Sequence, residues 1–465
     1  MFLSEKKQKK QIISWSLYDF ANQPYTTLII TFIYSAFFVN YIASNEQEGT
    51  FLWANAISIT AITVALISPI LGAFADNTGY RKSLLVFFTL MCCLFTSLLY
   101  FPEKGDIYLA LALVIISNIS FEMGTVFCNS YLNDLSNKKN IGKISGNAWG
   151  LGFLGGLLAL LCSFLLFDVN NSDGVKQVAI FVSLWFLFFS LPTFFYLDDN
   201  KRQKISKENL SSSYNSIIQT FKEISKYKEI VHFLIARLFY NDGLITIFAL
   251  GGIYAIGTLG FSMKEILILG IVLNVFAALG SFIFGYIEDK IGVKRVINFS
   301  LVMLVVSTTL AFISPWTSYP KVIFWISGVL LGTMVGPNQS CSRSYMAQII
   351  PENKKNEFFG FYAFTGNYGW AIILLTILVR VVFFPLNQYS MKSMGKMRSL
   401  APQLETIKAQ YKTDKVQMQK ATMELYRKNG VNPASSCFPI LIQLPIFFSL
   451  YKLIIAVLMT SKLCS

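Results

Sequence analysis

The sequence predicts an all-α polytopic membrane protein, and three observations favour this fold class. Hydrophobic residues make up 54% of the chain, aromatic residues 15%, and the mean hydropathy is +0.53. The apolar residues gather in blocks of about 20 residues, the length that a membrane-spanning helix needs. The formal net charge of +14 is concentrated in certain loops and in the C-terminal stretch. This distribution indicates orientation in a membrane and excludes sequence-specific nucleic-acid binding as the main function.

Ten apolar blocks precede residue 366, and each predicts a transmembrane helix. The expected spans lie near 23–43, 53–74, 83–101, 107–128, 147–167, 177–197, 231–257, 264–286, 297–313 and 321–346.

Loops rich in Lys and Arg alternate with loops that carry little positive charge. The cationic loops lie near 81–82, 138–143, 201–228, 290–295 and 354–355, so they all fall on one side of the membrane. Because cationic loops stay in the cytoplasm, we expect a cytoplasmic N-terminus, with every even-numbered span ending inside. The basic N-terminal stretch is followed by polar residues, which indicates an anchor and not a cleaved signal peptide.

One loop motif occurs twice at a fixed offset. GAFADNTGYRK at 72–82 is repeated as GYIEDKIGVKR at 285–295, and NKKN at 137–140 is echoed by NKKN at 353–356. The motif glycines allow tight turns with positive φ, and the acid and cations can pair at the cytoplasmic rim. The cation pair Arg81-Lys82 matches Lys294-Arg295. The motif residues of interest are Gly72, Asp76, Gly79, Arg81, Gly285, Asp289, Gly292 and Arg295.

This duplication resembles that of major facilitator transporters, which consist of two parallel six-span halves. The resemblance implies a first half over 1–197, a basic cytoplasmic linker over 198–230 and a second, truncated half over 231–366. The body is therefore expected to hold about ten helices in two parallel repeats.

Further motifs are similar to those of the autophagy-related vacuolar effluxer branch. They are WSLYDFAN at 15–22, SGNAWGLG at 145–152, FLGG at 153–156, ARLFYNDG at 236–243, SRS at 342–344 and NEFFGFY at 356–362. The similarity to this branch ends after the tenth predicted span. The resemblance implies that Asp76 faces the start of an eleventh span, so closure of the cytoplasmic gate is in doubt.

Ionisable side chains inside membrane spans are costly, so they are the default candidates for a substrate cavity. Arg237 either shares a helix face with Asp242 or pairs across the halves with Asp19, and Asp19 could instead only anchor its span at the inner rim. The glycines of 150–156 indicate close helix packing more than ligand contact. The substrate-cavity candidates are Asp19, Asn22, Glu122, Arg237, Asn241 and Asp242.

Residues 367–465 have a different character. YGWAIILLTILVR at 368–380, SMKSMGKM at 390–397, MELY at 423–426 and CFPILIQLPIF at 437–447 resemble YidC-type membrane protein insertases. The resemblance implies two apolar helices that flank a basic helical hairpin, with Arg380 in a hydrophilic groove for nascent membrane proteins. It also implies contacts of the hairpin with the ribosome or translocon. From the residues alone, Arg380 could instead snorkel to the interface, and the Met/Lys stretch could be a surface helix.

The two resemblances conflict at their junction. After ten spans the chain is in the cytoplasm, so a span over 368–386 would export the basic segment 387–433. The positive-inside rule and the insertase resemblance both favour the opposite side. We expect the structure to place this hairpin opposite the loop 198–230.

The sequence thus predicts a secondary-active transporter of a small solute, with membrane lipid and a coupling proton as further partners, in the bacterial inner membrane. The alternatives are a YidC-type insertase or chaperone and a fusion product without activity. His232 is the only histidine, which excludes a histidine-based catalytic triad or metal site. We expect no enzymatic activity and no cofactor.

Overall fold

The computed structural model describes residues 5–169, 171–199 and 207–366, with isolated positions between 407 and 428. Contacts group the chain into one compact unit over Met1–Ala371 and another over Ile372–Ser465. The helices α1 to α14 belong to the first unit. Arg380, the two apolar helices predicted in the tail and the side on which the basic hairpin lies fall outside the described residues.

The first half begins with one long span over Glu5–Ile42. This span consists of α1 (Glu5–Pro24), π-helical turns over Tyr25–Phe32 and Phe38–Ile42, and the short α2 (Tyr34–Phe37) between them. The other helices of this half are α3 (Glu46–Thr78), α4 (Arg81–Leu98), α5 (Ile107–Ser130), α6 (Leu132–Leu135), α7 (Ile141–Leu166) and α8 (Ser172–Tyr196).

The second half follows a linker helix, α9 (Lys207–Lys222), and a 3-10 turn, η3 (Ile224–Tyr227). Short 3-10 turns also follow α12 over Ser314–Trp316 and precede α14 over Glu352–Lys354. The helices of this half are α10 (Lys228–Leu259), α11 (Met263–Ile291), α12 (Val293–Ile313), α13 (Pro320–Ile349) and α14 (Lys355–Phe364).

The predicted all-α membrane fold is confirmed for the part of the chain that the structure describes. Nine of its helices are long and apolar enough to cross a membrane. The predicted span 231–257 is helical as α10 but is not among these nine. The first predicted boundary was wrong, because helix α1 starts at Glu5 instead of residue 23. Its early turns bury Trp15 and Tyr18 completely against other helices, so hydropathy underestimates how far the span extends.

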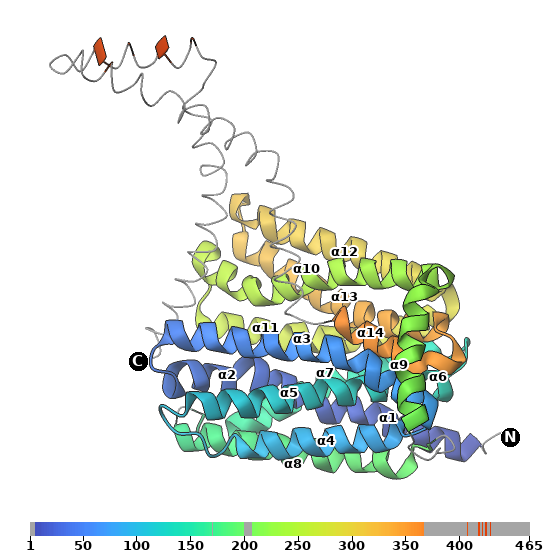
Figure 1. Cartoon of the computed structure of the whole chain (residues 1–465). Coiled ribbons are helices and arrows are strands. Elements are labelled where there is room, and N and C mark those ends of the chain that lie inside the picture. Colours follow the sequence, from blue (N-terminus) through green and yellow to red (C-terminus); the bar gives the residue numbers. More distant parts are fainter. Residues whose placement is uncertain are drawn as a thin grey trace. The chain divides into compact units, whose positions relative to one another are not determined.

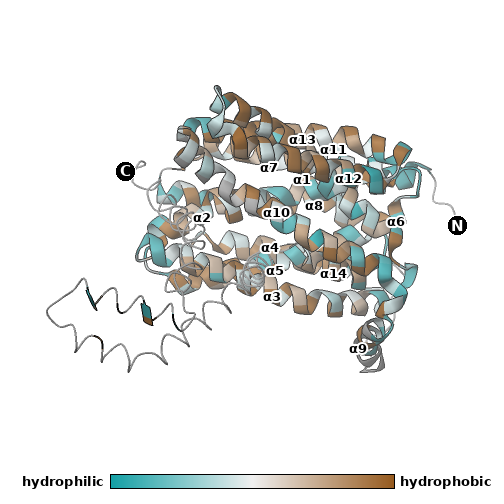
Figure 2. Ribbon diagram, turned by 90° about the horizontal axis from the view of Figure 1, so that it is seen from above, coloured by the Kyte–Doolittle hydropathy of each residue, from teal (hydrophilic) through white to brown (hydrophobic). Residues whose placement is uncertain are grey.

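The long helices of this unit run lengthwise beside one another, and α9 lies across their ends (Figure 1). Hydrophobic residues cover much of the length of the long helices, and hydrophilic residues gather at helix ends (Figure 2). Large exposed apolar side chains on these lengths include Leu66, Phe188 and Val305. Such faces are what lipid contact requires.

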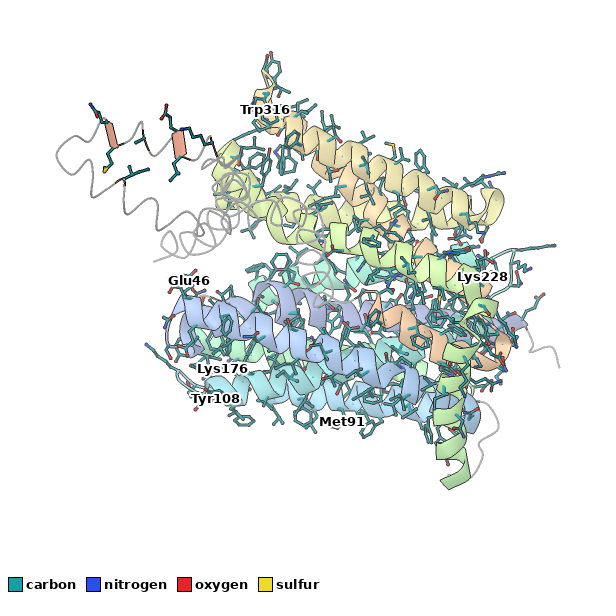
Figure 3. All side chains as sticks on the ribbon, turned by 45° about the horizontal axis from the view of Figure 1, so that its top comes forward. Glu46, Met91, Tyr108, Lys176, Lys228 and Trp316 are labelled. Carbon is teal, nitrogen blue, oxygen red and sulfur yellow. The ribbon has the colours of Figure 1, made fainter. Side chains whose placement is uncertain are left out.

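All the described cationic loops lie at one end of the unit, which we call the basic end. Figure 3 labels Lys228 there, whereas Glu46, Tyr108, Lys176 and Trp316 lie at the opposite end. The helices therefore alternate in direction as the charge pattern predicts. Both motif copies lie at the basic end, because α3 and α11 end there.

The motif glycines serve two different purposes. Gly79 and Gly292 have φ values of 76° and 97° at the ends of α3 and α11, so positive φ at these turns is confirmed. Gly72 and Gly285 instead lie inside the helices, where the prediction of a turn was wrong. A Cβ on Gly72 would lie 2.3 Å from the Asn356 carbonyl oxygen, and one on Gly285 would lie 2.8 Å from that of Gly142.

Glycine also sets the distance between α1 and α7. A Cβ on Gly155 would lie 2.3 Å from the Phe20 carbonyl oxygen, and one on Gly152 would lie 3.3 Å from that of Asp19. The interpretation of the 150–156 stretch as a helix-packing element is confirmed.

We expect Gly72→Ala to lower the thermal midpoint of the purified protein in detergent. The added methyl group would force α3 and α14 apart, and overpacking of this kind costs about 1–3 kcal/mol. Gly270→Ala in α11 is the control, because nothing lies within 4 Å of the added carbon. Its midpoint should stay equal or rise, since alanine favours the helix by about 1 kcal/mol over glycine. Equal midpoints for the two variants would contradict the close approach of α3 and α14.

Candidate functional site

An ion pair joins the two halves near the basic end of the unit, where α5 and α13 end and α7 begins. Nη1 of Arg343, in α13, lies 2.7 Å from Oδ2 of Asp19, in α1. The Arg343 side chain is 2% exposed and that of Asp19 is 13% exposed. A buried pair of this kind is stable only when its remaining hydrogen-bonding groups are also satisfied.

Arg343 meets this condition through contacts with two further helices of the first half. Its Nε and Nη2 donate to the hydroxyl and the carbonyl oxygen of Ser145, and Nη1 also donates to Oδ1 of Asn129. The guanidinium lies over the ring of Trp15, 4.7 Å from its centroid. Helices α1, α5 and α7 therefore all hold one arginine of the second half.

Sequence reasoning used Arg343 only as part of a family motif and missed it as a site residue. The available signal was the one applied elsewhere, namely an ionisable side chain inside a predicted span. Asp19 also does more than anchor its span, because its carboxylate pairs with Arg343 of the other half.

Arg237, in α10, has different partners from either of those predicted. Its Nη1 donates to the Tyr362 carbonyl oxygen at 2.8 Å and to the Thr365 hydroxyl at 2.6 Å. Its guanidinium lies 3.6 Å from the centroid of the Tyr362 ring. Its Nε is buried and has no partner in the described structure. Arg237 thus holds α14, and neither Asp19 nor Asp242 is its ion-pair partner among the described contacts.

The remaining cavity candidates differ in burial and in hydrogen-bond partners. Asn22 and Asn241 are each 5% exposed, and Oδ1 of Asn241 accepts from Gln339 at 3.0 Å. Asp242 is half-buried, with Oδ1 unpartnered among the described residues. Glu122 is half-buried in α5.

The first motif acid binds the start of α14. Asp76 accepts from the backbone N–H groups of Asn356 and Glu357 at 3.1 and 2.9 Å, and from the Asn356 side chain at 2.7 Å. A carboxylate here satisfies free N–H groups and complements the positive end of the helix dipole. The expectation that leaving the family pattern would compromise this contact was wrong, because residues 355–364 supply the helix that Asp76 needs.

The second motif acid binds the first half in the equivalent manner. Asp289 accepts from the backbone N–H groups of Gly142 and Lys143, at 2.8 and 3.0 Å, at the start of α7. In each half, therefore, a carboxylate near the end of one helix binds the first turn of a helix in the other half. The two motif copies lie at one end of the unit in equivalent contacts.

The motif cations do not pair with the motif acids, contrary to the expectation for the rim. Arg81 is buried and pairs with Asp134, and its guanidinium lies 3.6 Å from the Tyr131 ring centroid. Lys355 lies 2.7 Å from the same Asp134 carboxylate. Burial disfavours the charged lysine, but the Asp134 carboxylate more than compensates and raises the pKa of Lys355. Arg295 is exposed.

The linker helix α9 covers this contact. The hydroxyls of Ser216 and Thr220 donate to the Glu357 carboxylate, at 2.9 and 2.5 Å. Glu357 is fully buried, although it lies in the first turn of α14 near the basic loops. Asn77, next to Asp76, donates to Ser213 of α9 at 3.2 Å.

Two family models match the chain. "Vacuole effluxer Atg22 like" matches residues 46–376, and "60Kd inner membrane protein" matches residues 360–463. The two matched ranges overlap over residues 360–376.

Curated relatives divide in the same way. An uncharacterized MFS-type transporter, YxiO of Bacillus subtilis, is 29% identical over 81% of this chain and 89% of its own length. The membrane protein insertase YidC of Pelagibacter ubique is 53% identical, over 20% of this chain and 17% of its own length. The chain thus spans about a sixth of that insertase.

Solved structures show the same fold at low sequence identity. The MFS proton:xylose symporter XylE aligns with a TM-score of 0.64 at 15% identity, over 82% of this chain and 91% of that chain. A bacterial homologue of the iron transporter ferroportin, in an outward-facing state, aligns with a TM-score of 0.58 at 13% identity, over 78% of this chain and 90% of that chain.

The family match, the duplicated motif and the fold agree: the chain is a multi-pass membrane protein that belongs to the Atg22-like effluxer family of the major facilitator superfamily, and its C-terminal segment is similar to part of a YidC insertase.

Proposed function

We propose that this protein is a secondary-active transporter that moves a small solute by alternating access. One observation carries the proposal: two equivalent carboxylates, Asp76 and Asp289, each bind the start of a helix in the opposite half at the basic end. These contacts close one end of the unit without covalent linkage. A transporter needs such a closure, which is stable in one state and can be broken to reach the other.

Polar side chains between the halves form the proposed solute site. Arg343 and Asp19 pair across the halves, and Arg237, Asn241 and Asp242 lie on α10 of the second half. Ionisable groups inside membrane spans are costly, so they are candidates for contact with a solute or with a coupling proton. Alternating exposure of this site would deliver the solute from one side to the other.

We further propose that the basic end faces the cytoplasm of a bacterial cell, with the N-terminus inside and the chain in the inner membrane. The cationic loops gathered at this end support the orientation. The relatives are bacterial proteins whose names denote a transporter and membrane protein insertases, which supports the choice of membrane.

Membrane protein insertion is the second candidate function, favoured by the 53% identity over 94 residues with one YidC protein. Its partners would be nascent membrane proteins, with Arg380 in the groove. The segment similar to YidC covers 17% of that insertase's length. We therefore propose that transport, and not insertion, is the main function of this chain.

The first prediction concerns the closure at the basic end. In a cysteine-free background, Ser68→Cys places a thiol at a fully buried position of α3 that faces α14. Adding Asp76→Ala should raise the labelling rate of this thiol about tenfold or more, since a hydrogen bond to a charged group contributes about 1.5–3 kcal/mol. Asp173→Ala, an exposed acid at the start of α8, is the control. Unchanged labelling with Asp76→Ala would show that Asp76 does not hold this end closed.

The second prediction concerns transport itself. Proteoliposomes that contain the full chain are loaded with the small-solute fraction of a bacterial extract, and released solutes are identified by mass spectrometry. The wild type should release at least one solute faster than empty liposomes, and Arg343→Gln should abolish that release because Asp19 loses its buried partner. Arg295→Gln, at an exposed cation, should retain it. Equal release by the wild type, Arg343→Gln and Arg295→Gln would exclude solute transport through this site.

The third prediction separates the two candidate functions. Expression of the full chain in YidC-depleted bacteria should not restore growth, because the segment similar to YidC covers only 17% of that insertase's length. A complete YidC protein is the positive control, and immunoblotting confirms that both proteins reach the membrane. Restored growth that is lost in Arg380→Ala would favour the insertase function.

A further inference from the structure

One buried acid takes part in neither closure contact. Glu288 lies in α11 directly before the motif acid Asp289 and is only 2% exposed. The first motif copy has Ala75 at the equivalent position, where it is also 2% exposed. Closure of the basic end therefore does not need an acid at this position, so Glu288 serves another purpose.

The carboxyl group of Glu288 has few hydrogen-bond partners. The Ser344 hydroxyl, on α13, donates to Oε1, and the Cys341 thiol, a weak donor on the same helix, also acts on the carboxyl group. Oε2 is buried and has no hydrogen-bond partner among the described residues. A buried carboxylate with an unsatisfied oxygen costs far more free energy than a neutral acid, which carries no net charge.

No cation forms an ion pair with Glu288 among the described contacts. Asp289, the next residue, and Arg343, on α13, are the charged groups that act on it, with opposite signs. The Arg343 guanidinium, however, donates to residues of α1, α5 and α7, so its hydrogen-bonding groups are already used.

Charged groups on the other neighbouring helices have partners of their own. Nζ of Lys143, on α7, lies 5.1 Å from the centroid of the Tyr286 ring. Glu229, at the start of α10, and Lys294, at the start of α12, pair with each other at 2.8 Å. In the part of the chain that the structure describes, Glu288 is thus buried without a counter-charge bound to it.

The start of α7 covers the Glu288 side chain. A Cβ on Gly142 would lie 2.7 Å from both Cβ and Cδ of Glu288. The Gly142 backbone N–H is also the group that donates to Asp289 at 2.8 Å. One contact between the halves therefore both closes the basic end and excludes water from Glu288. Ser344 belongs to the second half and moves with Glu288, whereas α7 belongs to the first half and moves away.

We propose that Glu288 is a proton-binding site that links opening of the basic end to release of one proton. This proposal rests on the alternating-access function proposed above. While α7 covers the site, Glu288 is the neutral acid. When α7 leaves Asp289, water reaches the carboxyl group and hydrates it. The O–H bond of the acid then breaks, its electron pair stays on the carboxylate, and the proton passes to water.

The sign of the pH dependence follows from this linkage. The closed state binds one proton more than the open state, so raising the pH favours opening. A glutamate in contact with water is ionised above about pH 5. Over the range in which only the closed state keeps its proton, the ratio of open to closed protein should rise by up to about tenfold per pH unit.

The test measures opening as a function of pH. The full chain, cysteine-free apart from Ser68→Cys, is reconstituted in proteoliposomes and labelled with a thiol reagent from about pH 5 to about pH 8. Each rate is divided by that of the same thiol in denaturant, which removes the pH dependence of the thiol itself. The corrected rate of the protein with Glu288 should rise by up to about tenfold per pH unit within this range.

Two variants and a matched control identify the group responsible. Glu288→Gln is isosteric but cannot ionise, so its corrected rate should not change with pH. Glu288→Ala, which copies Ala75 of the first motif, should behave in the same way and keeps the test decisive if the glutamine variant does not fold. Glu229→Gln makes the same exchange at an acid of the basic end that is 57% exposed, and it should keep the full pH dependence.

The outcomes separate this proposal from the proposed function. If the thiol at position 68 reacts and its corrected rate does not depend on pH, the proton-binding role of Glu288 is wrong, whereas alternating access stands. The same holds if the rate rises equally with and without Glu288. If the thiol never reacts in membranes although it reacts in denaturant, the alternating-access function itself fails.

Discussion

The structure depends on one interaction that occurs twice, a carboxylate at the end of one helix that binds the first turn of a helix in the other half. Asp76 binds the start of α14 and Asp289 binds the start of α7. Backbone N–H groups at a helix start have no intrahelical partners, so a carboxylate there is stabilised by hydrogen bonds and by the helix dipole together. No side chain of opposite charge is required, which leaves the motif cations available for other contacts.

The neighbouring residues make this interaction geometrically feasible. Gly72 and Gly285 allow the backbones to approach closely enough for the carboxylates to reach the N–H groups. Asp134 then connects Arg81 with Lys355, and α9 covers Glu357 from the linker side. The closure is therefore built from many modest contacts. Such a set of contacts can be exchanged between two packed arrangements whose free energies differ by only a few kcal/mol.

Much of the fold follows from the sequence, because span length, loop charge and an internal repeat are direct consequences of membrane insertion and gene duplication. The pairing of ionisable residues does not follow from them. Hydropathy locates Arg237 and Arg343 in spans but carries no information on which helices meet. The start of α14 was missed for a related reason. Residues 355–364 lie beside the junction, and their pattern was interpreted as the end of the effluxer-like region and not as a gate helix.

The central claim is that the basic end must open for the protein to work, and a reversible cross-link tests it most directly. The Ser130 hydroxyl in α5 donates to Oδ1 of Asn356 in α14 at 2.6 Å, so cysteines at both positions in a cysteine-free background are placed to form a disulfide. Oxidation should abolish solute release from proteoliposomes, and reduction should restore it, while either single cysteine remains active under both conditions. Solute release that persists with the disulfide fully formed would contradict the account.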